Sequence, residues 1–225
     1  MGCNRHDRRA LRPAASLQYR ATAMTADLTI HVVEDDAGMR DALCLLLRSA
    51  GFDVHGHQDA ETFLAGGVCS QPICLLTDMR LPGMDGMALY RHLVRLGTDP
   101  AVVVITGHGD IPMAVSALKE GVVDFVEKPF DPALLLDSVR EASQRAVMNW
   151  ERRLQAADIE TRRSTLTSRE AMVLELLMDG YLNKTIAAQL GMSIRTAEHH
   201  RARIMEKMGA RSVSHLIRMM LGTHK

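Results

Sequence analysis

Five side chains able to bind a cation or a phosphoryl group occur just after short apolar runs: Glu34, Asp35, Asp78, Thr106 and Lys128. Carboxylates brought together repel one another by up to about 4 kcal/mol per pair at roughly 4 Å and an effective dielectric constant of about 20. Three of them therefore need a cation, and ligation by oxygen alone favours Mg²⁺. A lysine and a hydroxyl beside such an ion suit the remaining oxygens of a phosphoryl group. The residue types predict a Mg²⁺-dependent phosphoryl-transfer site.

The elements around these side chains follow from hydropathy. From Thr29 the chain alternates β-like apolar runs with amphipathic helical stretches, which predicts a parallel sheet with helices on both faces. We expect strands at 30–33, 52–55, 73–77, 101–105 and 122–126, and helices at 39–49, 60–64, 87–96, 113–119 and from 132 onward. Ligands bind outside the carboxyl ends of strands in such sheets. The candidate side chains follow the first, third, fourth and fifth strands, so we expect them at one sheet edge.

The charge distribution divides the chain into an acidic part and a basic part. Residues 28–139 carry 7 Lys and Arg against 16 Asp and Glu, whereas residues 166–225 carry 9 against 5. This asymmetry favours two domains with different partners, the second partner being a polyanion. No run approaches the roughly 20 apolar residues that span a bilayer. The cysteines show no zinc-type spacing, and we expect Cys44 and Cys74 to be buried thiols.

Helix signals in residues 166–225 predict four short helices. Thr167 and Glu170 have the spacing of a capping box, and Asn183, Ser193 and Ser212 are candidate caps of the later helices. The helices are expected to end at Gly180, Gly191 and Gly209. The helix after Ser193 is amphipathic, with an apolar side formed by Ile194, Ala197, Ile204, Met205 and Met208. Its polar side is formed by Thr196, His199, His200, Arg203 and Lys207. Such a stripe suits the major groove of DNA, although an isolated helix with this pattern is more often simply solvated.

Four motifs of the acidic part resemble those of receiver domains, in particular the FixJ-like branch of response regulators. They are Val33-Glu34-Asp35-Asp36, Leu76-Thr77-Asp78-Met79-Arg80-Leu81-Pro82-Gly83-Met84-Asp85-Gly86, Ile105-Thr106-Gly107-His108-Gly109-Asp110 and Glu127-Lys128-Pro129-Phe130. The resemblance implies a flavodoxin-like (βα)5 receiver domain with a five-stranded parallel sheet. Receivers often carry two aspartates where this chain has Glu34 and Asp35. For the longer side chain of Glu34, an approach to the metal through water is then one expectation.

The receiver resemblance also assigns roles within the pocket. It implies that Asp78 accepts a phosphoryl group from a sensor histidine kinase, and that Glu34, Asp35, Asp78 and the backbone carbonyl of Arg80 hold Mg²⁺. Thr106 and Lys128 would bind the phosphoryl group, Phe125 would move with Thr106, and the Lys128–Pro129 bond would be cis. Residues 113–125 would form the face through which phosphorylated copies make a homodimer. We interpret His108 as an exposed loop residue and His31 as a packed edge residue.

Residues 166–221 resemble the LuxR-type helix-turn-helix, a small all-α tetrahelical domain. The matching residues are Leu166 to Glu170, Asn183 to Ala187, Leu190 to Ser193, Arg195 to Glu198, His200-Arg201 and Lys207-Met208. The resemblance implies that the helix after Ser193 enters the major groove of double-stranded DNA. We expect base-edge contacts from Arg195, Thr196, His199 and Arg203, and phosphate contacts from Lys184, Arg201 and Lys207, with His200 in the same surface. His199 departs from the family, in which an apolar residue is frequent there.

The sequence thus predicts four segments. Residues 1–27 are expected to be a basic disordered extension. Alternatively, the start codon has been placed too far upstream and Met24 is the true first residue. Residues 28–145 form the receiver domain, 146–165 a helical linker and 166–225 the DNA-binding domain. We expect a cytoplasmic transcription factor, an activator that contacts RNA polymerase, and no conventional enzyme beyond the receiver's own phosphorylation and dephosphorylation.

Two rival functions remain open at this stage. One is a phosphorylation-independent DNA-binding regulator with a vestigial receiver. The other is an aspartyl-phosphate phosphatase, but that would need an acidic residue where Arg80 stands.

Overall fold

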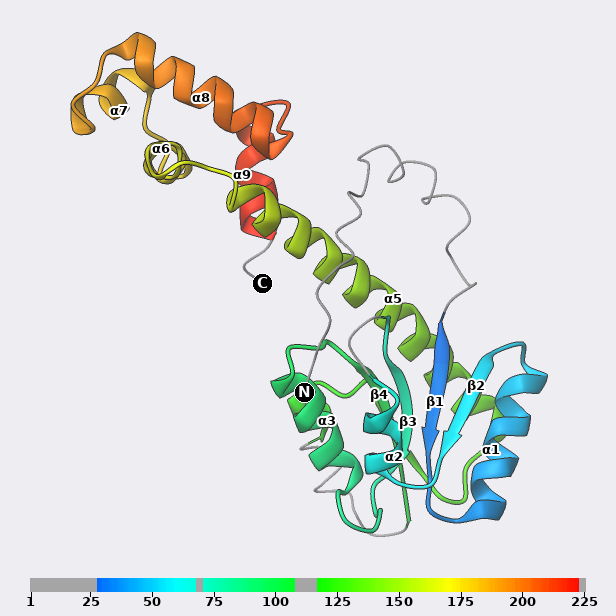
Figure 1. Cartoon of the computed structure of the whole chain (residues 1–225). Helices are drawn as coiled ribbons and strands as arrows, with labels where there is room; N and C mark the ends of the chain where they lie inside the picture. Colours follow the sequence, from blue (N-terminus) through cyan, green and yellow to red (C-terminus); the bar gives the residue numbers. More distant parts are fainter. Residues whose placement is uncertain (1–27, 68–70, 108–116, 223–225) are drawn as a thin grey trace, which may run out of the picture. The chain divides into compact units, whose positions relative to one another are not determined.

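The structure is a computed structural model that describes residues 28–67, 71–107 and 117–222 (Figure 1). Residues 1–27, His108 and the expected helix start at 113–116 lie outside the described residues. The chain divides into two compact units, with the boundary between Val147 and Met148. Within the described ranges, every helix falls short of the length and apolar character that a membrane crossing requires.

The first unit is built on one parallel sheet with the strand order β2-β1-β3-β4-β5. The strands are β1 (Thr29–Val33), β2 (Asp53–His57), β3 (Cys74–Asp78), β4 (Ala101–Thr106) and β5 (Asp124–Glu127). This is the doubly wound order of the flavodoxin-like sheet, so the predicted fold class is confirmed. The strand ends differ slightly from the prediction, because Asp78 and Thr106 are the last residues of β3 and β4 rather than the first residues beyond them.

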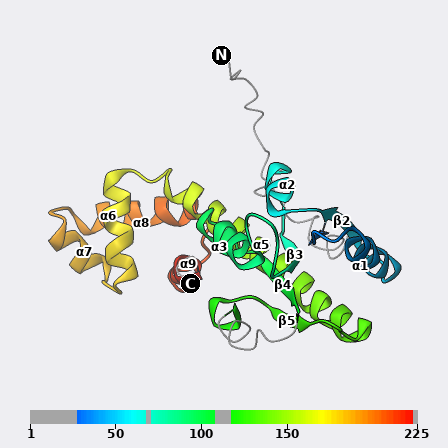
Figure 2. The same ribbon diagram turned by 90° about the horizontal axis from the view of Figure 1, so that it is seen from below.

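Helices cover both faces of this sheet (Figure 2). α1 (Ala37–Ser49) and the first part of α5 (Pro132–Arg163) pack with Ile30, Val32 and Val103 on one face. α2 (Ala60–Ala65) and α3 (Gly86–Arg95) pack with Leu75 and Val104 on the other, and residues 117–120 are also helical. Helices α1, α2 and α3 each begin after an aspartate whose side chain accepts a backbone N–H: Asp36, Asp59 and Asp85. These caps fix where each helix starts relative to the strand end before it.

The second unit contains the end of α5 and four shorter helices: α6 (Ser168–Met178), α7 (Asn183–Gln189), α8 (Ile194–Met208) and α9 (Val213–Gly222). The predicted capping box is confirmed, since Thr167 accepts from the Glu170 N–H and Glu170 accepts from the Thr167 N–H. Ser193 caps α8 as expected. The prediction for Asn183 was wrong, because Asn183 is the first residue of α7 and its Oδ1 accepts from Arg201 Nη1 at 3.3 Å.

An ion pair fastens α8 to the start of α6. Lys207 Nζ lies 2.6 Å from Glu170 Oε2 and 2.9 Å from the carbonyl oxygen of Thr165. The Glu170 side chain is only 7% exposed. The hydrogen bond from Lys207, helped by the Thr167 N–H, lowers the pKa of Glu170 to about 2. Arg162 adds a hydrogen bond of 3.0 Å from Nη1 to the carbonyl oxygen of Met208, so the end of α5 belongs to the core of this unit.

Replacing Glu170→Gln should therefore destabilise the second unit in a pH-dependent way. The folded pKa of Glu170 lies below its ordinary value of 4.5, so its stabilising effect is present above about pH 4.5 and is lost as the pH falls toward 2. We expect the variant's melting midpoint to lie on the order of 5 °C lower at pH 7, and to converge with wild type in acid. Differential scanning calorimetry measures both, with Glu175→Gln on the exposed side of α6 as control. A deficit that persisted unchanged to pH 2 would contradict the ion-pair explanation.

Candidate functional site

The carboxylates of Glu34, Asp35 and Asp78 converge at the carboxyl ends of β1 and β3. Each offers an oxygen, and these oxygens all lie within 4.8 Å of one another. The two strands are neighbours in the sheet, with Val33 paired to Thr77, which is why residues 44 positions apart in the chain meet here. Glu34 and Asp78 are buried, whereas Asp35 is exposed. The cluster therefore opens to solvent on the side of Asp35.

Lys128 bridges two of these carboxylates. Its Nζ lies 2.9 Å from Glu34 Oε2 and 2.5 Å from Asp78 Oδ2. The predicted cis Lys128–Pro129 bond is present, and the Lys128 N–H donates to the carbonyl oxygen of Thr106 at 2.7 Å. Burial raises the pKa of Glu34 and outweighs the opposing hydrogen bond from Lys128. The positive charge of the lysine offsets the negative charge of one of the three carboxylates. The cluster therefore keeps the negative charge and the oxygen donors that suit Mg²⁺.

The carboxylate and the backbone of Asp78 are both held in place. Asp78 Oδ1 accepts from the Arg80 N–H at 2.8 Å, so each carboxylate oxygen has a donor. Gly86, at the start of α3, packs so closely on this strand end that a Cβ there would collide with the Asp78 carbonyl oxygen. The Gly86 N–H also donates to the carbonyl oxygen of Met79. The requirement for glycine at position 86 thus comes from packing on Asp78.

Thr106 and Phe125 lie on the two strands beyond Asp78. Asp78 pairs with Ile105 of β4, so Thr106 is one residue further along, and its side chain is buried. Phe125 pairs with Val104 and packs, partly buried, against the cluster under α2 and α3. The structure therefore brings Glu34, Asp35, Asp78, Thr106 and Lys128 to one sheet edge, as the sequence predicted.

Arg40 is a residue of this site that the sequence analysis missed. Its Nη1 donates to the carbonyl oxygens of Glu34 and Asp35, at 2.8 and 3.3 Å, from the end of the first turn of α1. The side chain thereby fixes the backbone that presents both carboxylates. The available signal was an arginine four residues after the helix-capping Asp36, because that spacing returns its side chain toward the preceding loop.

The second candidate surface lies on α8 and the start of α7. The exposed side chains from the predicted DNA-binding set are Lys184, Arg195, Thr196, His199 and Arg203. Ala197, Ile204 and Met208 face the core of the unit, as expected. Ile194 departs from the predicted apolar side, since it is 48% exposed at the first turn of α8. The result is a polar and largely cationic stripe on a helix whose N-terminus is capped by Ser193.

Three members of the predicted DNA-binding set are less exposed than the others. His200 and Arg201 are half-buried, and Arg201 donates to Asn183 on α7. The ammonium of Lys207 is held by Glu170 and Thr165, within the ion pair described above. Arg201 and Lys207 therefore link helices of this unit.

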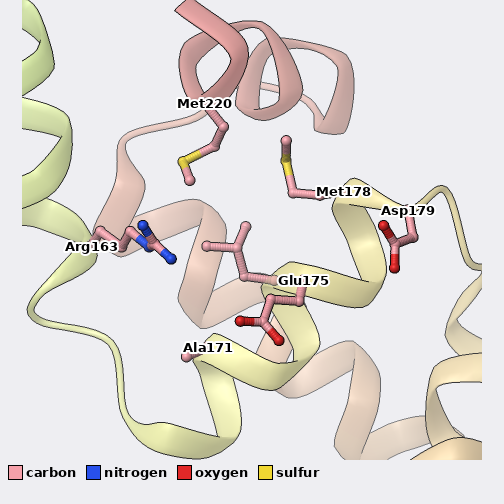
Figure 3. Close-up of a pocket in the computed structure, with 7 residues that line it drawn as sticks. Arg163, Ala171, Glu175, Met178, Asp179 and Met220 are labelled. Atoms are coloured by element: carbon pink, nitrogen blue, oxygen red, sulfur yellow. The ribbon is translucent and has the colours of Figure 1, made fainter. Parts of the chain in front are cut away.

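A separate cavity of about 270 Å³ occurs in the second unit (Figure 3). It is lined by residues from the end of α5, from α6 and the residue after it, and from α9: Arg163, Ala171, Leu174, Glu175, Met178, Asp179 and Met220. None of these lining residues comes from the acidic cluster or from α8. We assign the cavity no part in either site.

Comparisons with known proteins agree with this division of the chain. The family model of the response regulator receiver domain matches residues 30–140, and that of the luxR family of bacterial regulatory proteins matches residues 164–220. The transcriptional regulatory protein FixJ of Azorhizobium caulinodans is 43% identical over 198 residues, which cover 88% of this chain and 94% of that protein.

Solved structures give the same result for the full length. The response regulator StyR superposes with a TM-score of 0.71 at 40% identity, over 86% of this chain and 98% of that one. Full-length FixJ from B. japonicum gives a TM-score of 0.52, also at 40% identity, over 89% and 98%. The chain therefore belongs to the FixJ-like response regulators, which combine a receiver domain with a LuxR-type DNA-binding domain.

Proposed function

We propose that this response regulator is switched by phosphorylation of Asp78 and that its α8 helix reads operator DNA. The observation that carries the proposal is the position of the Asp78 carboxylate, which lies within reach of two further carboxylates and 2.5 Å from Lys128 Nζ. As a family member the chain is a DNA-binding regulator and not a conventional enzyme. The domains we propose are a receiver at 28–145, a helical linker at 146–165 and the DNA-binding domain at 166–225, after an extension at 1–27.

The residues of the pocket have complementary tasks in phosphoryl transfer. An oxygen of Asp78 attacks phosphorus, a bond from phosphorus to the donor's nitrogen or oxygen breaks, and the product is an acyl phosphate on Asp78. Glu34, Asp35, Asp78 and the backbone carbonyl of Arg80 would hold Mg²⁺, which offsets charge on the phosphoryl oxygens. Lys128 and Thr106 would contact the oxygens that remain. Arg40 keeps the Glu34–Asp35 backbone in place during the exchange.

We propose that the signal leaves the pocket through Thr106 and Phe125. Thr106 would turn toward the phosphoryl group, and Phe125, on the neighbouring strand, would move into the space it leaves. A differential affinity of a few kcal/mol between two receiver conformations is enough to shift most of the population. Residues 113–125 would then form the homodimer face. Two α8 helices would be placed on half-sites about one helical turn of DNA apart.

The partners that follow are a sensor histidine kinase, double-stranded DNA and RNA polymerase, in the cytoplasm. Within the DNA-binding domain we assign base-edge contacts to Arg195, Thr196, His199 and Arg203, and a phosphate contact to Lys184. His200 and Arg201 border this surface. We leave Lys207 out of the DNA contacts, because its ammonium is engaged by Glu170 and Thr165.

Asp78→Asn should abolish phosphorylation, because an amide is no nucleophile toward phosphorus. Incubation of the full chain with radiolabelled acetyl phosphate and Mg²⁺ should label wild type, and chelation of Mg²⁺ should prevent labelling. The matched control is Asp41→Asn, an exposed aspartate on α1 that should label normally. Equal labelling of the Asp78 variant would refute the assignment, and an unlabelled wild type would favour the vestigial receiver.

Lys128→Met should separate metal binding from phosphoryl acceptance. The Lys128 ammonium competes with a metal ion for Glu34 Oε2 and Asp78 Oδ2. We therefore expect the Mg²⁺ affinity, measured by isothermal titration calorimetry, to be equal or higher in the variant. The rate of phosphorylation by acetyl phosphate should fall at least about tenfold, because one donor to the phosphoryl oxygens is gone. Weaker Mg²⁺ binding together with an unchanged phosphorylation rate would contradict this assignment, because it would make Lys128 a support for the metal site and not a phosphoryl contact.

Arg195→Ala and Lys184→Ala should weaken DNA binding in different ways. On duplexes selected by the wild-type chain from a random pool, Arg195→Ala should cost about 1–3 kcal/mol and relax the base preference at one position. Lys184→Ala should weaken binding to all sequences and reduce the slope of log affinity against log salt by about one. Arg218→Ala, on the exposed side of α9, serves as the cationic control. Fluorescence anisotropy at several salt concentrations decides, and identical losses in all three variants would contradict the assignment.

A further inference from the structure

Three histidines gather on one face of the sheet, beside the strand end that carries the acidic cluster, since the His57 carbonyl oxygen accepts from the Glu34 N–H at 3.1 Å. In the parallel pairing of β1 with β2, His31 lies opposite His55, and Val33 lies opposite His57. Because alternate residues of a strand share a face, His31, His55 and His57 all point to the side covered by α2. β2 is the edge strand of the sheet, so this group lies at its border.

The imidazoles of His31 and His57 already converge. His31 Nδ1 lies 3.0 Å from His57 Nε2, and the ring centroids are 5.2 Å apart. Phe63 of α2 meets both rings edge-on, at centroid distances of 5.0 and 5.3 Å, and forms an apolar wall beside the pair. The exposed ring of His55 is centred 6.4 Å from that of His31. A nitrogen of His31 and a nitrogen of His57 therefore face each other, and the ring of His55 is the third imidazole of the group.

The His31 ring is neutral at physiological pH. Burial, followed by the proximity of His57, lowers the pKa of His31 to about 4. Neutral imidazole is the form that binds metals, so an ion meets no competition from protons at His31.

We propose that His31 and His57 bind a divalent transition-metal ion such as Zn²⁺, with His55 as the third ligand. Metal–nitrogen distances of about 2.0–2.1 Å place two nitrogen ligands of one ion roughly 2.9–3.4 Å apart, for bond angles of about 90–110°. The observed 3.0 Å lies within that interval. Imidazole ligands suit zinc, copper and nickel, whereas Mg²⁺ prefers oxygen. The site is therefore chemically distinct from the acidic cluster.

Binding needs a change of protonated nitrogen in one ring, a turn of both facing rings toward a common point, and a movement of the His55 side chain. In the metal-free pair, one of the two facing nitrogens carries the hydrogen that the other accepts. When both lone pairs turn to the metal, that ring carries its proton on its other nitrogen instead, so no proton need leave the protein. His55, on the exposed edge strand, turns its ring toward the pair. The backbone of the site stays as it is, since β1 and β2 remain paired.

The test is a calorimetric titration of the full chain with ZnCl₂ in excess Mg²⁺, which occupies oxygen-only sites. Wild type should bind Zn²⁺ at a site that His57→Gln weakens at least about tenfold. His55→Gln should also weaken it, by a smaller factor. The control is His92→Gln, a histidine of α3 outside the group, which should bind Zn²⁺ as wild type does. A melting curve of each variant without metal verifies that it is folded.

A second readout keeps the test independent of other zinc-binding side chains. Zn²⁺ should raise the melting temperature of the first unit in wild type and in His92→Gln, because an ion bound only by the native state stabilises it. His57→Gln should lose this shift. The proposal is overturned if folded His57→Gln binds Zn²⁺ as tightly as wild type, or if wild type shows no Zn²⁺-dependent shift. Unchanged affinity in His55→Gln would overturn the assignment of the third ligand.

Discussion

The electrostatic repulsion among Glu34, Asp35 and Asp78 is the constraint on which the first unit's chemistry depends. Parallel strands bring their carboxyl ends to one edge, so the sheet itself forces these carboxylates together. Lys128, which directly follows the last strand of the sheet, offsets part of that repulsion. A pocket held in this balance is sensitive to any added charge. In the proposed function a divalent cation would relieve the repulsion, and a phosphoryl group on Asp78 would give Lys128 a new partner.

The second unit uses a similar contact for a different purpose. Glu170 is buried against Lys207, and the same carboxylate closes the capping box of α6 through Thr167. The pair joins the start of the first helix of that unit to the end of α8. Arg201 joins α8 to Asn183 of α7, and the ion pair joins its end to the start of α6, so its exposed cationic stripe has a defined orientation within the unit. In our proposal the pocket pair changes partners when its ligands bind, whereas the Glu170–Lys207 pair is structural.

Much of this arrangement could be predicted from the sequence. Strand-end side chains such as Asp78 and Thr106 were placed correctly, because the carboxyl ends of parallel strands must share an edge. Contacts that depend on side-chain direction were harder to predict. Lys207 has the residue type and helix position of a DNA contact. Only the packing of α8 on α6 reveals that its partner is Glu170. Asn183 has the residue type of a helix cap, but α7 begins one residue earlier than that role requires, and Arg201 takes its oxygen.

The histidines also show what sequence-based prediction cannot reach. The sequence predicts His31 as a packed edge residue. It does pack against Phe63, but the edge position was wrong, because β1 lies between β2 and β3 in the sheet. Strand pairing adds what a single position cannot indicate, namely that His57 lies diagonally across from it, with its Nε2 3.0 Å from His31 Nδ1. Register is set by the whole sheet, so pairs of this kind become visible only once the strand order is known.

The central claim is that phosphorylation of Asp78 controls DNA binding by α8. It is tested most directly by the DNA affinity of the full chain, measured with and without acetyl phosphate in Mg²⁺, for wild type and for Asp78→Asn. The account predicts that acetyl phosphate tightens wild-type binding at least about tenfold, equivalent to about 1.4 kcal/mol, and leaves the variant unchanged. Equal affinity of wild type in both conditions, despite stoichiometric phosphorylation, would contradict it.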